Sequence, residues 1–268
     1  MSKSANLAKG LFTKSLGYLP TPTLSFVPRK YQPHAPIHNP YVEEENLTHL
    51  GKRIVTSLED QWAVVGVRRS GKSTWARNLL LNLQDSYPAM RTYILDSSND
   101  KDFRSFPGTH LETEEAPDPM YRPGGVQVWR PPIDDIEEYD QWLIKILRAE
   151  QPAIVLIDEL SSLGGMTGRS FPRGYFLLSK QGGKHGISLI SCTQEASYIP
   201  RVTLGQTTHL VRFRLINRHD SKKVDEILRR PEKDWGKDPP HKYGFFHRRT
   251  DQDGPGHYYQ NHQEFFAA

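Results

Sequence analysis

The sequence reads Gly66-Val67-Arg68-Arg69-Ser70-Gly71-Lys72-Ser73 directly after the apolar run Trp62–Val65. This stretch fits the pattern G-x-x-x-x-G-K-[ST], and residues 74–83, with apolar side chains at helical spacing, follow it. A strand, a glycine-rich turn and a helix in this order suit phosphate, because glycines let the backbone approach the anion and the helix start presents unpaired N–H groups. A glycine-rich turn that only begins a helix is the alternative. We therefore predict a phosphate-binding loop.

The phosphate-binding pattern indicates roles for the polar side chains of this loop. Lys72 is expected to reach the β- and γ-phosphates, and the Ser73 hydroxyl to ligate Mg²⁺. Arg68 and Arg69 are unusual in such a loop and either assist phosphate binding or project into a subunit interface. The predicted cofactors are ATP and Mg²⁺, and the predicted nucleotide-binding residues are Gly66, Val67, Arg68, Arg69, Ser70, Gly71, Lys72, Ser73 and Thr74.

Two carboxylates follow the wholly apolar run Ala153–Ile157. A buried strand delivers Asp158 and Glu159 at its carboxyl end, which is where parallel sheets bind ligands. Asp158 is predicted to hold Mg²⁺, and Glu159 to polarise the water that attacks the γ-phosphate. The simpler alternative is a strand that ends in solvent.

Thr193-Gln194 end another apolar run, which begins at Ile187. A polar side chain at this strand tip is close enough to the γ-phosphate to sense it or to order the water. A residue that only caps a loop is the alternative. We interpret Cys192 as a small buried side chain, not a reactive thiol.

The remaining pattern alternates strands with helices, which predicts an α/β fold with a mostly parallel sheet covered on both faces. Helices are expected over 74–83 and 136–147, and a loop over 106–125. The predicted strands are 62–65, 91–96, 126–129, 153–157, 187–191 and 209–216.

Composition limits the class of protein. The chain has 268 residues, 35 Lys+Arg, 31 Asp+Glu and one cysteine, which excludes an internal disulfide and a zinc site with two thiolates. No apolar run approaches the ~18 residues of a membrane-spanning helix, and the N-terminus lacks the apolar stretch of a secretion signal. The sequence therefore favours a protein of a reducing compartment. A net charge of +4 is too small to indicate a nucleic-acid partner by itself.

The N-terminal arm differs from the rest of the chain. Residues 1–42 contain five Lys or Arg, no Asp or Glu, and six prolines, which disfavour helices and central strands. The segment 7–16 fits a short basic helix that touches a membrane surface or an acidic partner, or else the arm is a solvated tail. We predict an arm over 1–50, an ATPase core over 51–230 and an extension over 231–268 with a small hairpin.

Basic residues also gather after the last core strand. They either line a pore and contact DNA phosphates, or form a solvated helix face balanced by Asp220, Asp225, Glu226 and Glu232. The residues are Arg212, Arg214, Arg218, Lys222, Lys223, Arg229, Arg230 and Lys233.

Taken together, Gly66–Ser73, Ile154–Glu159, Gly183–Ser188, Thr193-Gln194 and Ile199-Pro200-Arg201 resemble the FtsK/HerA superfamily of DNA-translocating ATPases. Within it the chain is most similar to the genome-packaging ATPases of double-jelly-roll viruses, both nucleocytoplasmic large DNA viruses and membrane-containing icosahedral phages. The resemblance covers residues 54–229.

The resemblance implies a RecA-like (ASCE) fold, a ring that is usually hexameric, and ATP-driven movement of double-stranded DNA through its pore. It implies that Gln194 senses the γ-phosphate and that a neighbouring subunit contributes an arginine finger. Lys184 stands where the family has the Arg of Gly-Arg-His, and Arg169, Arg173 and Arg201 are alternatives. It further implies a place in the host cytoplasm or at the virion vertex, where the arm docks to capsid or virion-membrane proteins.

Three other readings compete with this one. Asn217-Arg218-His219-Asp220 mimics the guanine-reading motif of GTPase switches, although the Gly that such switches need after Asp158 is absent. A small-molecule kinase has no evident need for Glu159 and Gln194. A nucleotide-dependent assembly scaffold, which is not an enzyme, is the third alternative, and a cellular or plasmid translocase stays open within the motor reading.

Overall fold

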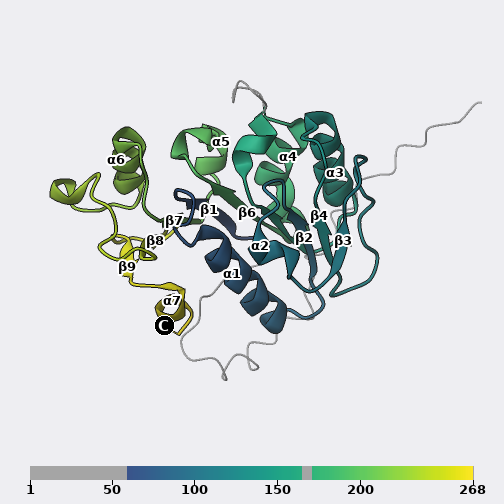
Figure 1. Cartoon of the computed structure of the whole chain (residues 1–268), viewed down its shortest axis with the longest axis horizontal. Coiled ribbons are helices and arrows are strands. Elements are labelled where there is room, and N and C mark those ends of the chain that lie inside the picture. The colour runs from purple at the N-terminus through teal and green to yellow at the C-terminus, as the bar shows by residue number, and fades with distance from the viewer. Residues whose placement is uncertain (1–58, 165–170, 268) are drawn as a thin grey trace, which may run out of the picture. The chain divides into compact units, whose positions relative to one another are not determined.

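The computed structural model describes residues 59–164 and 171–267 (Figure 1). Within these ranges nine strands form one sheet in the order β3-β4-β2-β5-β6-β1-β7-β8-β9. Neighbours from β3 to β7 pair in parallel, whereas β8 and β9 are antiparallel additions. The strands are β1 (Gln61–Val65), β2 (Arg91–Leu95), β3 (Thr109–Leu111), β4 (Val126–Trp129), β5 (Ala153–Ile157), β6 (Ile187–Thr193), β7 (His209–Arg212), β8 (Phe245–Arg249) and β9 (His257–Tyr259).

Helices cover both faces of this sheet. Because side chains alternate along a strand, Val64 packs with the cluster that contains α1, and Val65 packs with the cluster that contains α3 and α4. All residues of β1, β5 and β6 are buried, which explains why β1 and β5 are almost wholly apolar, while β6 also buries Ser188, Ser191 and Thr193. The helices are α1 (Lys72–Ser86), α2 (Lys101–Arg104), α3 (Ile136–Arg148), α4 (Arg173–Gln181), α5 (Arg201–Leu204), α6 (Arg218–Ile227) and α7 (His262–Ala267).

The predicted fold class is confirmed, since the sheet is mostly parallel with helices on both faces. Two elements differ from expectation. The loop predicted over 106–125 contains β3, a three-residue edge strand that is too short and too exposed to leave an apolar pattern. The strand predicted over 209–216 ends at Arg212. Beyond it the Phe213 amide donates to the Val65 carbonyl at 2.8 Å, and the Arg214 carbonyl accepts from the Val67 amide at 3.0 Å.

The segment after residue 230 joins the same sheet. Strand β8 pairs with β7, and β9 pairs with β8, so the two strands form an antiparallel hairpin. Helix α7 packs against α1, where Phe265 and Phe266 lie 5.6 and 6.1 Å from Trp75, centroid to centroid. The arm predicted over 1–50 lies outside the described residues. Among the helices that the structure describes, none has the length and apolar character to cross a bilayer.

Strand order decides what meets at the carboxyl edge of the sheet. Strand β6 lies between β1 and β5, and pairs in parallel with both. Consequently Gln194, which follows β6, lies between the phosphate-binding loop after β1 and the carboxylates after β5. The order of these segments along the chain does not reveal this arrangement, because β6, the last of the three strands in sequence, lies between the other two in the sheet.

Candidate active site

The phosphate-binding loop is anchored to the strands on both sides of β1. The Gly66 amide donates to the Thr193 carbonyl and the Val67 amide to the Arg214 carbonyl, each at 3.0 Å. Glycine is required at two positions. A Cβ on Gly66 would lie 2.6 Å from Phe213 Cβ, and Gly71 has a φ of 100°, in the left-handed region that other residues rarely adopt.

The loop delivers its lysine and serine at the first turn of α1. This turn contains no acidic residue, and Gly71 at its N-cap offers no side-chain hydrogen bond, so the helix start keeps its positive character for an anion. Lys72 is buried yet lines the cavity described below. The geometry therefore provides backbone N–H groups and an ammonium group on one side of a single space.

Asp158 lies opposite the start of α1. Ser73 Oγ donates to Asp158 Oδ1 at 3.3 Å, and Ser98 Oγ donates to Asp158 Oδ2. Burial raises the pKa of Asp158 to about 7, against the lowering effects of the Ser98 hydrogen bond and the Lys72 ammonium. A hydroxyl and a carboxylate at this spacing are oxygen ligands of the kind that Mg²⁺ uses alongside waters and phosphates, so these two residues fit that ion.

Glu159 and Gln194 meet beside this pair. Gln194 Nε2 donates to Glu159 Oε2 at 2.9 Å, and Ser161 Oγ donates to Glu159 Oε1 at 2.9 Å. Both Glu159 and Gln194 line the same cavity as Lys72. Strand β6 therefore brings the amide of Gln194 to the carboxylate that the sequence predicted as a base.

A cavity of about 920 Å³ joins these groups. Its floor is the phosphate-binding loop, where Arg68 and Arg69 are exposed. Thr74 also lines it, although its hydroxyl donates to Asp102 Oδ2 at 2.7 Å and so ties α1 to α2.

Part of this cavity wall was not predicted from the sequence. Phe213 follows β7, Lys242 and Tyr243 precede β8, and Asn261 and His262 follow β9. No motif marks these five residues. The pairing of β7 with β1 brings Phe213 to the loop, and the pairing of β8 and β9 onto β7 brings the other four.

A second buried pair supports the floor near α2. Arg130 Nε donates to Asp96 Oδ2 at 2.6 Å, and the Asp100 amide donates to Asp96 Oδ1 at 2.7 Å. Burial raises the pKa of Asp96, while the bond from Arg130 lowers it. The pair fixes the turn after β2 that carries Ser98 to Asp158.

The residues suggested for an arginine finger lie away from the cavity. Lys184 is exposed at the amino end of β6, the end opposite to the phosphate-binding loop. Arg173 and Arg201 are exposed first residues of α4 and α5. Arg169 lies outside the described residues. Among the described candidates none lines the cavity of its own subunit.

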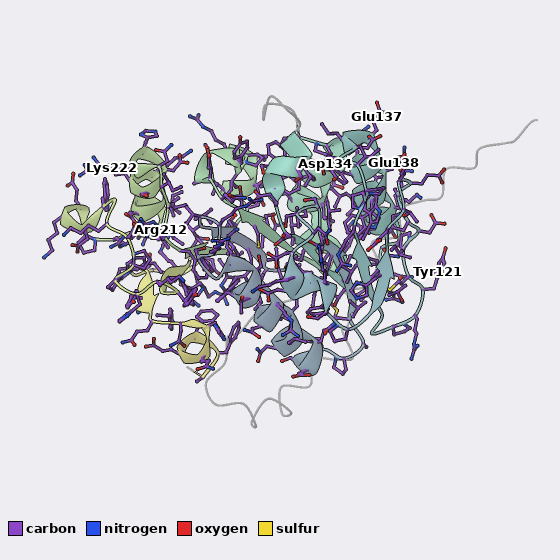
Figure 2. All side chains as sticks on the ribbon, in the orientation of Figure 1. Tyr121, Asp134, Glu137, Glu138, Arg212 and Lys222 are labelled. Atoms are coloured by element: carbon purple, nitrogen blue, oxygen red, sulfur yellow. The ribbon has the colours of Figure 1, made fainter. Side chains whose placement is uncertain are left out.

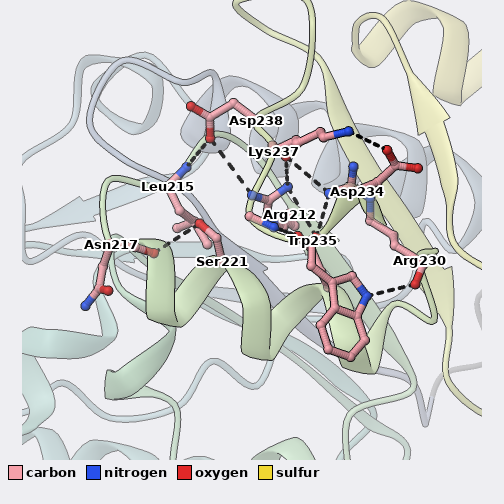
Figure 3. Close-up of polar contacts among 11 residues, drawn as sticks. Arg212, Leu215, Asn217, Ser221, Arg230, Asp234, Trp235, Lys237 and Asp238 are labelled. Carbon is pink, nitrogen blue, oxygen red and sulfur yellow. Dashed lines mark hydrogen bonds and ion pairs between the residues drawn. The ribbon is translucent and has the colours of Figure 1, made fainter. Parts of the chain in front are cut away.

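Within the basic cluster, Arg212 and Arg230 are neutralised by Asp225, which corrects the pore alternative for Arg212. Its side chain is fully buried, lies 3.4 Å from Asp225 Oδ1 and donates to the Lys237 carbonyl at 3.1 Å (Figure 3). Arg230 Nη1 donates to the same Asp225 oxygen at 2.7 Å. A buried arginine cannot contact DNA, whereas Lys222 on α6 is exposed (Figure 2).

The guanine-reading mimic caps a helix. Asn217 Oδ1 accepts from the His219 amide at 2.9 Å and from the Asp220 amide at 3.4 Å, at the start of α6. Asn217 does not line the cavity, and Asp220 is buried. The motif is thus explained by helix capping.

No protein-family model matches the sequence, and the search of curated proteins finds no match. Solved structures share the fold. The DNA-packaging ATPase B204 from Sulfolobus turreted icosahedral virus has a TM-score of 0.60 at 13% identity, over 77% of this chain and 99% of that one. The genome-packaging NTPase B204 of Sulfolobus turreted icosahedral virus 2 with AMPPCP has 0.57 at 13%, over 77% and 100%.

The likeness extends to a plasmid protein. The pCW3 conjugation coupling protein TcpA, solved with ATPγS, has a TM-score of 0.51 at 17% identity, over 79% of this chain and 64% of that one. At these identities the comparisons establish the fold, and at that level they confirm the resemblance to packaging and coupling ATPases.

Proposed function

We propose that this chain is an ATP-hydrolysing DNA translocase of the FtsK/HerA type that moves viral double-stranded DNA into a capsid. One observation carries the proposal: β6 between β1 and β5 places Gln194 Nε2 2.9 Å from Glu159 Oε2, beside the Ser73–Asp158 pair. The arrangement supplies a phosphate cradle, a metal-binding pair, a base and an amide in one cavity.

In this proposal each group has a separate task. The loop amides and Lys72 hold the phosphates, and Ser73 with Asp158 holds Mg²⁺, which neutralises phosphate charge. Glu159 Oε1 or Oε2 accepts a proton from the attacking water. Gln194 donates either to Glu159, as here, or to the γ-phosphate, and this choice reports the nucleotide state to β6.

The motor requires partners that are also proposed. The chain assembles into a ring, in which a basic residue of a neighbour completes each site. The candidates for this basic residue are Lys184, which lies at the end of β6 far from the site of its own subunit, and Arg169, Arg173 and Arg201. Double-stranded DNA passes through the ring, and the arm over 1–50 docks to capsid or virion-membrane proteins in the host cytoplasm or at the vertex.

The viral assignment is supported by how much of each similar structure this chain matches. The packaging ATPase of Sulfolobus turreted icosahedral virus matches over 99% of its length, whereas the coupling protein TcpA matches over 64%. The likeness to TcpA keeps a plasmid or cellular translocase as the second candidate.

The test is ATP turnover with and without double-stranded DNA, together with the mass of the assembly in a non-hydrolysable ATP analogue. We expect turnover stimulated by DNA and a ring-sized mass, both lost in Lys72→Ala. Unstimulated turnover by a monomer would overturn translocation and leave an ATPase. Nucleotide-dependent assembly without turnover would favour the scaffold alternative.

A further inference from the structure

One wall of the cavity has no task in phosphate chemistry. It is formed by chain segments that follow β7 and flank the β8–β9 hairpin, and it faces the phosphate-binding loop. Its members are aromatic or carry amide and imidazole groups: Phe213, Tyr243, Asn261 and His262, with Lys242 beside them.

Tyr243 stands out among the aromatic side chains of this region. It is 50% exposed, whereas Phe245, Phe265 and Phe213 are buried to 2% or less. Its ring lies over the phosphate-binding loop, since Tyr243 Cδ1 is 3.4 Å from the position that a Cβ on Gly71 would occupy. Lys242 Nζ lies 4.9 Å from the ring centroid. An exposed flat ring beside the phosphate-binding loop suits stacking with the base of a nucleotide whose phosphates the loop holds.

Asn261 adds a directional group to this wall. Its Oδ1 accepts from the Glu264 amide at 3.0 Å at the start of α7, which fixes the side chain. Within the described residues its Nδ2 has no hydrogen-bond partner. Because Asn261 lines the cavity, this amide leaves a free donor there, and a purine ring nitrogen is a fitting acceptor for it.

We propose that Tyr243 and Asn261 form the nucleobase subsite: a purine stacks on the Tyr243 ring, and Asn261 Nδ2 donates to one of its ring nitrogens. The inference rests on the proposed function, because it concerns the base of the nucleotide whose phosphates occupy the loop. It makes the segment 242–262 part of the nucleotide site and the source of its preference for a nucleotide over bare polyphosphate.

The test compares ATP with inorganic tripolyphosphate, which has the phosphates but no base. Both are measured with Mg²⁺ as competitors of a fluorescent ATP analogue on the full chain. Tyr243→Ala is expected to weaken ATP about 10-fold, since a base stacked on an aromatic ring contributes roughly that factor or more, and to leave tripolyphosphate unchanged. Tyr243→Phe keeps the ring and is expected to bind ATP like the unchanged chain.

Two further variants complete the design. Tyr121→Ala removes a tyrosine that is 84% exposed and outside the cavity wall, and is expected to change neither affinity. Asn261→Ser keeps a helix-capping oxygen but removes the amide donor, so ATP affinity should fall about 3-fold with tripolyphosphate unaffected.

The outcomes separate this inference from the proposed function. Equal weakening of both ligands by Tyr243→Ala, or no weakening of ATP, would overturn the subsite and leave the ATPase proposal intact. Tripolyphosphate binding as tight as ATP to the unchanged chain would do the same. Failure of the unchanged chain to bind either ligand would overturn both.

Discussion

Two charged regions of this molecule use their charge in opposite ways: the open region at the carboxyl edge of the sheet, and the closed region around α6. At the carboxyl edge of the sheet, Lys72, Asp158 and Glu159 line a cavity, and burial raises the pKa of Asp158 to about 7. In the closed region, Arg212 and Arg230 share Asp225, so these two guanidinium groups are already paired inside the chain. The difference teaches that charge density does not identify a site; what matters is whether a partner inside the chain already occupies the charged groups.

The largest expected effect tests the open region. Glu159→Gln keeps the shape and the contact with Ser161 but cannot accept a proton, so ATP turnover should fall by about 10²–10⁴-fold while ATP affinity is retained. Steady-state turnover and nucleotide binding measure the two effects. Glu195→Gln, an exposed neighbour outside the cavity wall, is the matched control. Unchanged turnover in Glu159→Gln would remove the catalytic assignment.

The next effect tests the closed region. Arg212→Ala leaves Asp225 buried with one partner fewer, and the free energy of unfolding should fall by about 3–5 kcal/mol. Arg214→Ala removes a side chain that is 67% exposed and pairs with Asp238, and should cost at most about 1 kcal/mol. Urea unfolding measures both. A stable Arg212→Ala protein that loses its stimulation by DNA would restore the pore interpretation.

A third prediction concerns the pH dependence of the free energy of unfolding, which involves buried histidines on β7 and β8. His247 Nε2 and His209 Nδ1 lie 3.0 Å apart, and His209 Nε2 lies 3.1 Å from Asp60 Oδ2. Burial lowers the pKa of His247 to about 3, with further lowering by His209, His257 and Arg249. The unfolded chain binds the proton more readily, so the stability from His247 is full above pH 6.5 and lost as pH falls toward 3.

The measurement is the free energy of unfolding at pH 7 and pH 5. His247 should account for a loss of about 2 kcal/mol over this interval. His247→Phe removes the titrating group and should reduce the pH dependence by that amount. His219→Gln changes an exposed histidine on α6 and should leave the profile unaltered. If the free energy of unfolding depended on pH equally in His247→Phe and in the unchanged chain, the prediction would be contradicted.

The sequence predicted the open region better than the closed one, for a physical reason. The phosphate-binding loop and the Asp158-Glu159 pair are local patterns, because their chemistry needs fixed residue types at short spacing. The strand end predicted that Gln194 lies near the γ-phosphate, but its contact with Glu159 was not predicted, since that contact depends on strand order. Tyr243 and Asn261 reach the cavity only through the β8–β9 hairpin, and no local pattern predicts that.

The burial of Arg212 could not be predicted from the sequence either. A basic residue at the end of a strand looks the same in sequence whether it faces DNA or Asp225. Its partners are Asp225 on α6, the next element along the chain, and Asp238 in the turn before β8. A long-range ion pair leaves no periodicity, whereas the alternation of buried side chains in β1 and β5 does.

The smallest expected effect concerns Asn217, in the segment between β7 and α6, and tests whether its side chain caps a helix or reads a base. Asn217 follows β7 at the edge that carries the phosphate-binding loop, yet its Oδ1 caps α6. If capping is its whole role, Asn217→Ala should lower the free energy of unfolding by about 1 kcal/mol, and Asn217→Ser should retain most of it. The ratio of ATP to GTP affinity should be the same in all three proteins, because no guanine contact is lost. A specific loss of GTP binding in Asn217→Ala, with Asn217→Ser equally affected, would show that the side chain reads a base. The segment between β7 and α6 would then belong to the nucleotide site.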